Sequence, residues 1–246
     1  MASAALLAAV GEVGKGFVKE RTSETLPCQA QDKLFCWEWA TENIDRYGTP
    51  TVQHLELVGF SVLIGFGIAF ALSLLAHRRA WLRPPFLVGT GVLYTIPSVA
   101  FFFLLLPITG RGMETAIIAL SAYTLQIIYR NTTTGLANVP SSVRDAARGM
   151  GMTERQILWK VEVPLATPEI VAGLRIATVS TVALATLAVF AGGGGLGTEI
   201  YGRGNLRFAT TIIIAGGIAM LMALVFDALL LLGQRLTTPW RKAAAG

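Results

Sequence analysis

Charged residues are scarce in this chain: Asp, Glu, Lys and Arg make up 14% of its 246 residues, whereas a soluble domain carries about 25%. Apolar residues make up 53%, and they are gathered into runs as long as a bilayer is thick rather than spaced periodically around one core. This composition excludes an ordinary soluble domain. The sequence therefore predicts an all-α integral membrane protein.

Cysteine and histidine are nearly absent, with two residues of each. Cys28 and Cys36 lie close together near the N-terminus with no histidine beside them, so a zinc site lacks ligands. If this segment faces an oxidising compartment, the two cysteines form either a local disulfide or two free thiols. His54 and His77 both fall near the ends of apolar runs, which argues against an intramembrane enzyme. We expect no catalytic residue, no metal and no bound cofactor in this chain.

Nucleotide and nucleic-acid motifs are also missing. No G-x-x-x-x-G-K-[ST] loop occurs, so the chain cannot hydrolyse ATP by that mechanism. The run from Gly192 to Gly197 satisfies G-x-G-x-x-G, but it follows an apolar run and lacks the acidic residue about 20 positions on that dinucleotide sites require. We interpret it as a flexible or re-entrant extracytoplasmic segment. The net charge of +5 forms no basic stripe of the kind that binds nucleic acid.

Five apolar runs predict membrane spans, at about 55–77, 86–108, 113–130, 170–191 and 208–233. The first carries a stripe of small residues on which another helix can pack closely: Ser61, Gly65, Ala69 and Ser73. The second is interrupted by Pro97, so we expect a kink or break there. The predicted transmembrane domain extends from 54 to 234.

The loops between these spans differ in basic residues, and short cytoplasmic loops are enriched in Lys and Arg. Twelve of the twenty basic residues follow the first, third or fifth span, and three lie in the opposite loops. We therefore expect an N-out, C-in topology, with residues 1–53 extracytoplasmic and 235–246 a cytoplasmic tail. Apolar residues at helical spacing in the first segment predict either an amphipathic interfacial helix or a loosely ordered arm. These residues are Leu6, Val10, Val13 and Phe17.

The longest predicted cytoplasmic loop, residues 131–169, is neither typical of a disordered linker nor apolar enough for the bilayer. Residues 143–150 predict a short helix that ends at Gly149 or Gly151, and Thr153 is a candidate cap for a second helix. The expected pattern is helix, glycine turn, helix.

This loop resembles the signature of binding-protein-dependent ABC permeases, which is EAA, three residues, Gly, nine residues, then Ile-x-Leu-Pro. Here it stands as Asp145-Ala146-Ala147, Gly151 and Val161-Glu162-Val163-Pro164. Asp replaces Glu and Val replaces both aliphatic residues, while the spacing is kept. The resemblance implies a coupling helix whose small alanines enter a groove on a separate ATPase subunit. The glycine would permit the turn, and Pro164 would end the second helix before the fourth span. The acid at Asp145 makes either a charge-assisted contact or a helix cap.

The wider chain, from about 54 to 232, is similar to the osmoprotectant permeases for glycine betaine, carnitine and choline. The shared motifs are Gln53–Leu57, Tyr94–Ser98 and Ala191–Gly197. The resemblance implies a type I ABC importer permease in the bacterial cytoplasmic (inner) membrane. Its partners would be ATPase subunits that bind ATP and Mg²⁺, a second permease subunit in a homodimer or heterodimer, and an extracytoplasmic solute-binding protein.

The solute implied is a small zwitterion or quaternary ammonium compound. The alternative is another small solute, such as an amino-acid derivative or a thiol-imidazole betaine. An ion-coupled secondary carrier is a weaker alternative, because no internal repeat is evident and the middle of the spans is nearly free of charge.

A few polar residues remain within or beside the spans. Asp227 lies inside the fifth span, and we expect it to reach the interface or pair with a basic residue rather than to line a pathway. His54 and Glu56 are expected to be solvated at the outer end of the first span. The candidates for lining a substrate pathway surround the expected break: Tyr94, Thr95, Pro97 and Ser98.

Overall fold

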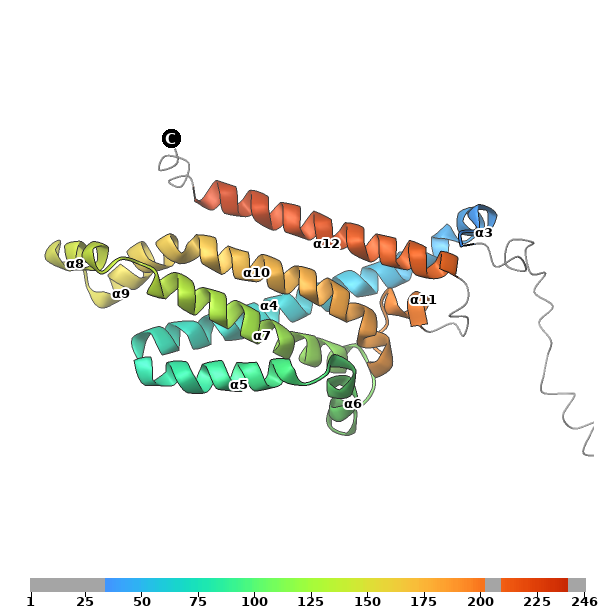
Figure 1. The fold of residues 1–246 in the computed structure, drawn as a ribbon, viewed down its shortest axis with the longest axis horizontal. Helices are drawn as coiled ribbons and strands as arrows, with labels where there is room; N and C mark the ends of the chain where they lie inside the picture. The colour runs from blue at the N-terminus through green and yellow to red at the C-terminus, as the bar shows by residue number, and fades with distance from the viewer. Residues whose placement is uncertain (1–33, 202–208, 239–246) are drawn as a thin grey trace, which may run out of the picture.

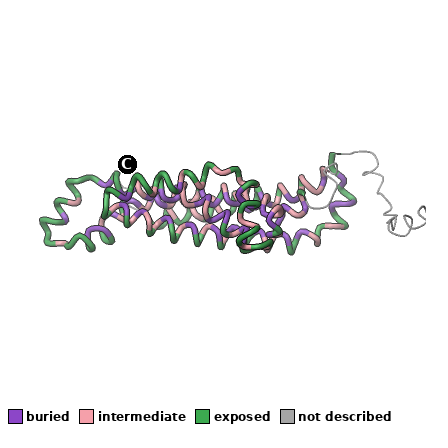
Figure 2. The backbone as a smooth tube through the Cα atoms, turned by 90° about the horizontal axis from the view of Figure 1, so that it is seen from below, coloured by how far each residue is buried: buried purple, intermediate pink, exposed green. Residues whose placement is uncertain are grey.

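The computed structural model describes residues 34–201 and 209–238, and every element in these ranges is a helix (Figure 1). Most of the helices run lengthwise in one elongated bundle, with buried residues along its interior (Figure 2). Three helical stretches are long and apolar enough to cross a membrane by themselves: Ile44–Arg78, Glu154–Ala191 and Ala209–Thr237. The expectation of an all-α membrane protein is confirmed.

The main helices of the bundle are α4 (Gly48–Arg78), α5 (Arg83–Thr95), α6 (Ser98–Thr109), α7 (Met113–Ala137), α10 (Val163–Ala185) and α12 (Ala209–Thr237). Shorter helices connect them: α3 (Trp37–Glu42), α8 (Ser141–Gly149), α9 (Glu154–Ile157) and α11 (Gly197–Tyr201). Short segments of other helix types complete the described elements: the 3₁₀ helices η2 (Ile44–Tyr47), η3 (Ala80–Leu82) and η5 (Thr186–Ala191), and the π-helical η4 (Leu158–Glu162).

The centre of the bundle is α7, which packs against α4, α5, α6 and α10. Leu120, Ile128 and Leu136 are fully buried along it. Buried threonines and serines are interleaved with them, which lowers the hydropathy of α7 below that of the other long helices. A helix surrounded by protein does not need an apolar surface on every side. The helix also continues seven residues past the predicted end of the third span.

The small-residue stripe on α4 faces α7, as the spacing predicts. Ser61, Gly65, Ala69 and Ser73 are all buried. A Cβ atom at Gly65 would overlap Thr124 Oγ1 on α7, so the two backbones cross at a distance that only glycine allows. The hydroxyl of Ser73 donates to Ala69 O at 2.7 Å within α4 and lies 3.4 Å from Tyr129 O on α7, so this position of the stripe also contacts α7.

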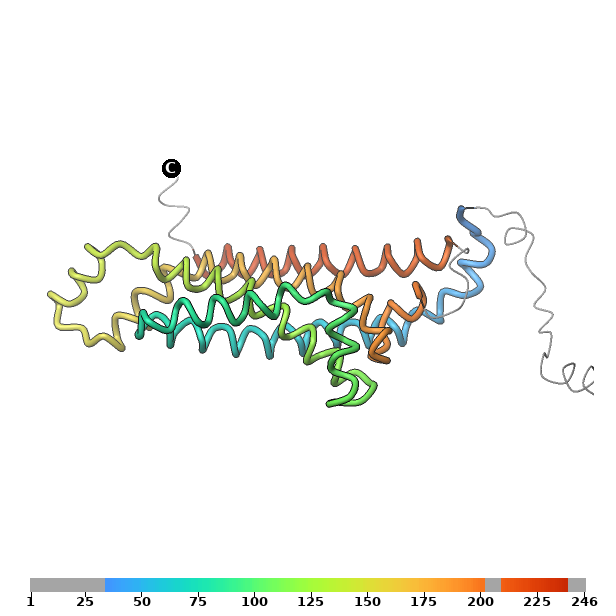
Figure 3. Tube along the Cα trace, turned by 60° about the horizontal axis from the view of Figure 1, so that its bottom comes forward, coloured from blue at the N-terminus to red at the C-terminus, as the bar shows by residue number. Residues whose placement is uncertain are grey.

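The helix break predicted near Pro97 is confirmed, and it is sharp. α5 and α6 meet at 98°, so the predicted span 86–108 is two helices that do not share an axis, and α6 runs across the lengthwise direction of the other helices (Figure 3). Ile96 is extended because the residue before a proline is excluded from the helical region. Its freed carbonyl accepts a hydrogen bond from the hydroxyl of Tyr123 on α7.

The prediction that Pro164 ends a helix is wrong. The helix that begins at Glu154 continues through η4 into α10, and Pro164 lies in the first turn of α10. Proline is tolerated in a first turn, and here a π-helical turn precedes it, so its missing N–H falls at a junction between two hydrogen-bonding patterns. The loop predicted at 131–169 is correspondingly shorter, since helix already covers both of its ends.

Candidate functional site

The helix that carries the Asp-Ala-Ala sequence, α8, lies at one extremity of the bundle (Figure 1). Asp145 and Ala146 are exposed, whereas Ala147 is only 2% exposed and packs inward. The two alanines therefore have different environments. Ala146 belongs to the free face of α8, and Ala147 holds α8 against the rest of the chain.

The predicted glycine turn follows α8. Gly151 has a φ of +81°, and its N–H donates to Arg148 O at 2.9 Å, while the next amide, Met152 N, donates to Ala147 O at 3.2 Å. These bonds satisfy carbonyls at the end of α8. A Cβ at Gly151 would meet nothing within 4 Å, so glycine is needed there for its backbone conformation and not for space.

The second helix begins where Thr153 was expected to cap it. Thr153 Oγ1 accepts from Gln156 N at 3.4 Å, and Thr153 N donates to Gln156 Oε1 at 2.8 Å, which together form a capping box. The glycine turn and this cap fix the angle between α8 and the helix that continues into α10.

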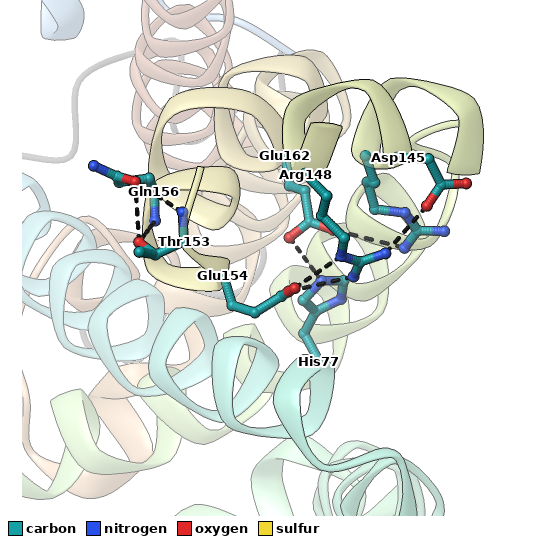
Figure 4. A network of polar contacts seen from close by, with 8 residues as sticks. His77, Asp145, Arg148, Thr153, Glu154, Gln156 and Glu162 are labelled. Atoms are coloured by element: carbon teal, nitrogen blue, oxygen red, sulfur yellow. Dashed lines mark hydrogen bonds and ion pairs between the residues drawn. The ribbon is translucent and has the colours of Figure 1, made fainter. Parts of the chain in front are cut away.

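Exposed charges tie α8 to α9 across the turn. Arg148 Nε donates to Glu154 Oε1 at 2.8 Å, and Arg148 Nη1 donates to Asp145 Oδ1 at 3.1 Å (Figure 4). The hydrogen bond from Arg148 holds the pKa of the Glu154 carboxyl below its ordinary value. Because both side chains are in water, this pair stabilises the turn weakly. Asp145 therefore makes a charge-assisted contact with Arg148 and does not cap a helix. Its side chain stays exposed to solvent.

A second group of polar side chains, centred on a buried carboxylate, lies beside α8. Glu162 in η4 lies between His77 at the end of α4 and Arg144 on α8, with its oxygens 3.0 Å from His77 Nε2 and 3.6 Å from Arg144 Nη1 (Figure 4). Sequence reasoning missed this cluster. The available signal was a lone acidic residue, Glu162, between two valines at a position directly before a membrane helix.

At the other end of the bundle, the glycine run folds back against α4. Gly195 N donates to Gln53 Oε1 at 3.1 Å, and Leu196 N donates to His54 Nδ1 at 3.3 Å. The other ring nitrogen of His54 lies 3.1 Å from Val182 O. The expectation that His54 is solvated is wrong, because its ring is fully buried between these segments. Glu56 is exposed, as expected.

The acidic residue in the fifth span has a basic partner, as expected. Arg175 on α10 donates to Asp227 on α12 through Nε at 2.9 Å and Nη2 at 2.8 Å. The pair borders an otherwise largely apolar groove between the two helices. The two-pronged geometry neutralises both charges within the span.

The four residues predicted to line a pathway lie together at the α5–α6 break. The ring of Tyr94 is exposed and packs edge-on against Tyr123 at 6.0 Å. Thr95 and Pro97 are also exposed, and Ser98 is half-buried at the start of α6. Their role in a pathway stays a prediction.

Other expectations fall partly or wholly outside the described residues. Cys36 is buried and its N–H donates to Thr210 Oγ1 at 2.9 Å, but Cys28 lies outside the described ranges, so the disulfide stays a prediction. The four residues of the predicted N-terminal amphipathic helix, Leu6, Val10, Val13 and Phe17, also lie outside the described ranges. Within 34–201 and 209–238, no group of three or more His, Cys, Asp or Glu side chains is placed to hold a metal ion.

Comparison with known proteins gives consistent matches in sequence. Osmoprotectant import permease protein OsmW of Salmonella typhimurium (strain LT2) is 37% identical over 204 residues, which cover 80% of this chain and 94% of that protein. Carnitine transport permease protein OpuCB of Listeria monocytogenes is 38% identical over 188 residues, which cover 76% of this chain and 85% of that protein. Choline transport system permease protein OpuBB of Bacillus subtilis (strain 168) is 34% identical over 190 residues, which cover 77% of this chain and 87% of that protein.

Solved structures match the fold. A chain of the MetNI methionine ABC transporter, in an inward-facing conformation, superposes with a TM-score of 0.69 at 23% identity and covers 76% of this chain and 93% of its own length. A chain of an amino acid ABC transporter superposes with a TM-score of 0.68 at 19% identity, and the match covers 81% of this chain and 98% of the other. At these identities the likeness concerns the fold alone.

The family itself is shown by the sequence. Residues 62–239, which include the whole segment from α8 to α10, match the family described as the binding-protein-dependent transport system inner membrane component. The signature spacing in the loop, the fold of an ABC permease and the sequence relatives agree with this match. The chain belongs to the binding-protein-dependent transport system inner membrane components.

Proposed function

We propose that this chain is the permease subunit of an ABC importer for a small osmoprotectant, driven by a separate ATPase that docks on α8. The observation that carries the proposal is the geometry of the coupling segment. A short helix with an exposed Asp145 and Ala146 stands clear of the bundle, and its angle is set by the glycine at Gly151 and the cap at Thr153. A projecting helix held at a fixed angle can transmit a movement of the docked ATPase to the membrane helices.

The membrane arrangement supports this role. We propose five spans, N-out and C-in, with the second formed by the broken pair α5 and α6. The end of α4 that lies beside α8 carries His77 and Arg78, and Arg79 and Arg83 follow it in the chain. By the positive-inside rule, this concentration of basic residues supports the proposal that the α8 end of the bundle lies in the cytoplasm. An ATPase would be found on the same side.

The proposed assembly has two permease subunits, two ATPase subunits that bind ATP and Mg²⁺, and an extracytoplasmic solute-binding protein, in the bacterial inner membrane. Closure of the ATPases on ATP would displace α8 and rock the spans between inward-open and outward-open states. The chemistry of ATP hydrolysis would occur on the partner chains. This chain would supply the pathway and the coupling.

The solute proposed is a small zwitterion or quaternary ammonium compound such as glycine betaine, carnitine or choline. The relatives whose names include osmoprotectant, carnitine and choline transport support this choice. The alternative is another small solute, such as an amino-acid derivative. Binding measurements on a candidate solute-binding protein from a neighbouring gene would separate them, because a quaternary ammonium headgroup is held by aromatic rings that an ordinary amino acid does not need.

The docking step can be tested by adding bulk to the free face of α8. Ala146→Trp should abolish copurification with an ATPase encoded beside this chain and should abolish uptake, because a large side chain cannot enter a groove shaped for a small one. Ala80→Trp is the matched control, since Ala80 is also exposed at the same end of the bundle but lies outside α8. A wild-type chain that fails to bind the ATPase, or an Ala146→Trp variant that binds normally, would contradict the proposal.

A further inference from the structure

Glu162 is a buried carboxylate at the junction between the coupling segment and α10. Only 5% of the residue is exposed, and both of its oxygens have a partner. Oε2 lies 3.0 Å from His77 Nε2, and Oε1 lies 3.6 Å from Arg144 Nη1. Burying a carboxylate costs free energy unless it is paired, so these two contacts keep the side chain in one position.

The two partners of Glu162 come from elements far apart in the sequence. His77 lies in the last turn of α4, at the inner end of the first membrane helix, and Arg144 lies on α8. Glu162 itself belongs to the π-helical turn that continues without interruption into α10. One side chain therefore joins the coupling helix to two membrane helices (Figure 4).

Among the described residues, the other polar side-chain contacts of α8 reach α8 itself and the first turn of the helix that continues into α10, but they do not reach α4. Arg148 pairs with Asp145 on α8 itself and with Glu154 at the start of α9, and all three side chains are exposed. Such pairs in water contribute little. Across residues 34–201 and 209–238, the bridge through Glu162 is the polar link that runs from α8 to α4.

We propose that Glu162 is a positioning residue that locks α8 to the inner end of α4, so that a displacement of α8 moves α4 and α10 as one unit. The inference rests on the proposed docking of the ATPase on α8. Without the bridge, α8 stays attached through Ala147 and the glycine turn, but a push on it can be taken up by rotation at Gly151. The ATPase then binds and turns over while less of its motion reaches the spans.

The test uses the complex of this chain with its ATPase and solute-binding protein in lipid vesicles. Glu162→Gln keeps the size of the side chain and an acceptor for His77, but it removes the charge that attracts Arg144. We expect copurification with the ATPase to be retained and the solute taken up per ATP hydrolysed to fall about tenfold, the scale on which single residues alter coupling between sites. Glu169→Gln is the matched control, because Glu169 lies on α10 and forms no ion pair within the described part of the chain.

Variants at His77 separate the bridge from a general loss of stability. His77→Gln retains an N–H donor towards Glu162 and should preserve uptake per ATP, whereas His77→Leu should lower it as Glu162→Gln does. Amide hydrogen exchange provides a second readout: the amides of α8 should exchange faster in Glu162→Gln, while those of α7 should not change. This pattern would show that the bundle stays folded while α8 is released.

The outcomes distinguish this inference from the proposed function. If the wild-type chain does not bind the ATPase, the proposed function fails. The positioning role of Glu162 then fails as well, because it rests on that docking. If the wild-type complex forms and transports, but Glu162→Gln leaves uptake per ATP and α8 exchange unchanged, only the bridge is overturned. Loss of copurification in Glu162→Gln would also overturn it, because Glu162 would then act in docking or folding and not in positioning.

Discussion

Replacement of Gly65 by alanine would test the central packing of the bundle, the crossing of α4 and α7. A Cβ at Gly65 overlaps Thr124 Oγ1 and lies 3.0 Å from Thr124 Cβ and 3.1 Å from Ser121 O. The hydroxyl can rotate away if it gives up its bond to Ser121 O, but the Cβ and the backbone oxygen move only with α7 itself. Since carbon atoms prefer a separation of about 3.5–4.0 Å, the helices must part by roughly 0.5–1 Å.

The expected cost of Gly65→Ala follows from two opposing effects. Overpacking of a close contact typically costs about 1–3 kcal/mol. Alanine favours helix over glycine by about 1 kcal/mol, which offsets part of this cost. The net expectation is a destabilisation of up to about 2 kcal/mol, or a fall in the unfolding midpoint of up to about 8 °C for a chain of this size.

Gly67 provides the matched control on the same helix. It is exposed, and a Cβ there would meet nothing within 4 Å, so Gly67→Ala should gain helix propensity without a clash. Thermal unfolding of both variants in the same detergent, followed by the loss of soluble monodisperse protein, gives the comparison. Equal midpoints for Gly65→Ala and Gly67→Ala would refute the close crossing of α4 and α7.

Three further predictions concern the ends of the bundle and the fifth span. Gly151→Val should weaken copurification with the ATPase, because a β-branched residue at a φ of +81° costs at least about 1–2 kcal/mol and changes the angle of α8. Asp227→Asn should lower the amount of folded protein in the membrane by leaving Arg175 without its charge partner, and Arg175→Gln in the same chain should restore it. Because Arg148 lowers the pKa of the Glu154 carboxyl in the folded chain, their pair stabilises the turn above the ordinary pKa of Glu, and this small contribution should be lost as the pH falls through the lowered value. Hydrogen exchange at the turn should report that loss.

Each of these predictions has its own control. Gly149→Val tests bulk without the positive φ, since a Cβ at Gly149 has no neighbour within 4 Å, and it should bind the ATPase better than Gly151→Val. A single Asp227→Asn variant with normal membrane levels and unchanged uptake would exclude both a structural and a pathway role for that carboxylate. Glu154→Gln should remove the acid dependence of exchange at the turn, and persistence of that dependence would assign it to another group.

Local signals in the sequence predicted much of the fold. Pro97 ended α5 because a proline restricts its neighbour wherever it stands. Gly151 and Thr153 predicted the turn between α8 and α9, since positive φ and capping depend on a few adjacent residues. The long apolar runs predicted α4 and α12 because their faces are largely exposed outside the bundle, where lipid selects apolar side chains.

The sequence was less informative where distant segments meet. Nothing near Glu162 indicates that His77, 85 residues earlier, lies within 3.0 Å of it. His54 was expected to be solvated because its neighbours look interfacial, yet a segment 142 residues later packs over it. Pro164 was taken as a helix end because proline usually breaks helices, and the π-helical turn that accommodates it has no recognisable sequence signal.

The uninterrupted helix that contains Pro164 has a geometric consequence for motion. From Glu154 to Ala185 the chain forms one rod of 32 residues, which at 1.5 Å per residue is about 48 Å long, compared with about 30 Å for the hydrocarbon core. More than a third of the rod can therefore stand outside the bilayer as a lever arm. Treated as one straight body that pivots about Ala185, the rod tilts by only about 6° for a displacement of about 5 Å at its outer end. A small angular change within the lipid is then enough to accommodate a full turn of helix travel at the membrane surface.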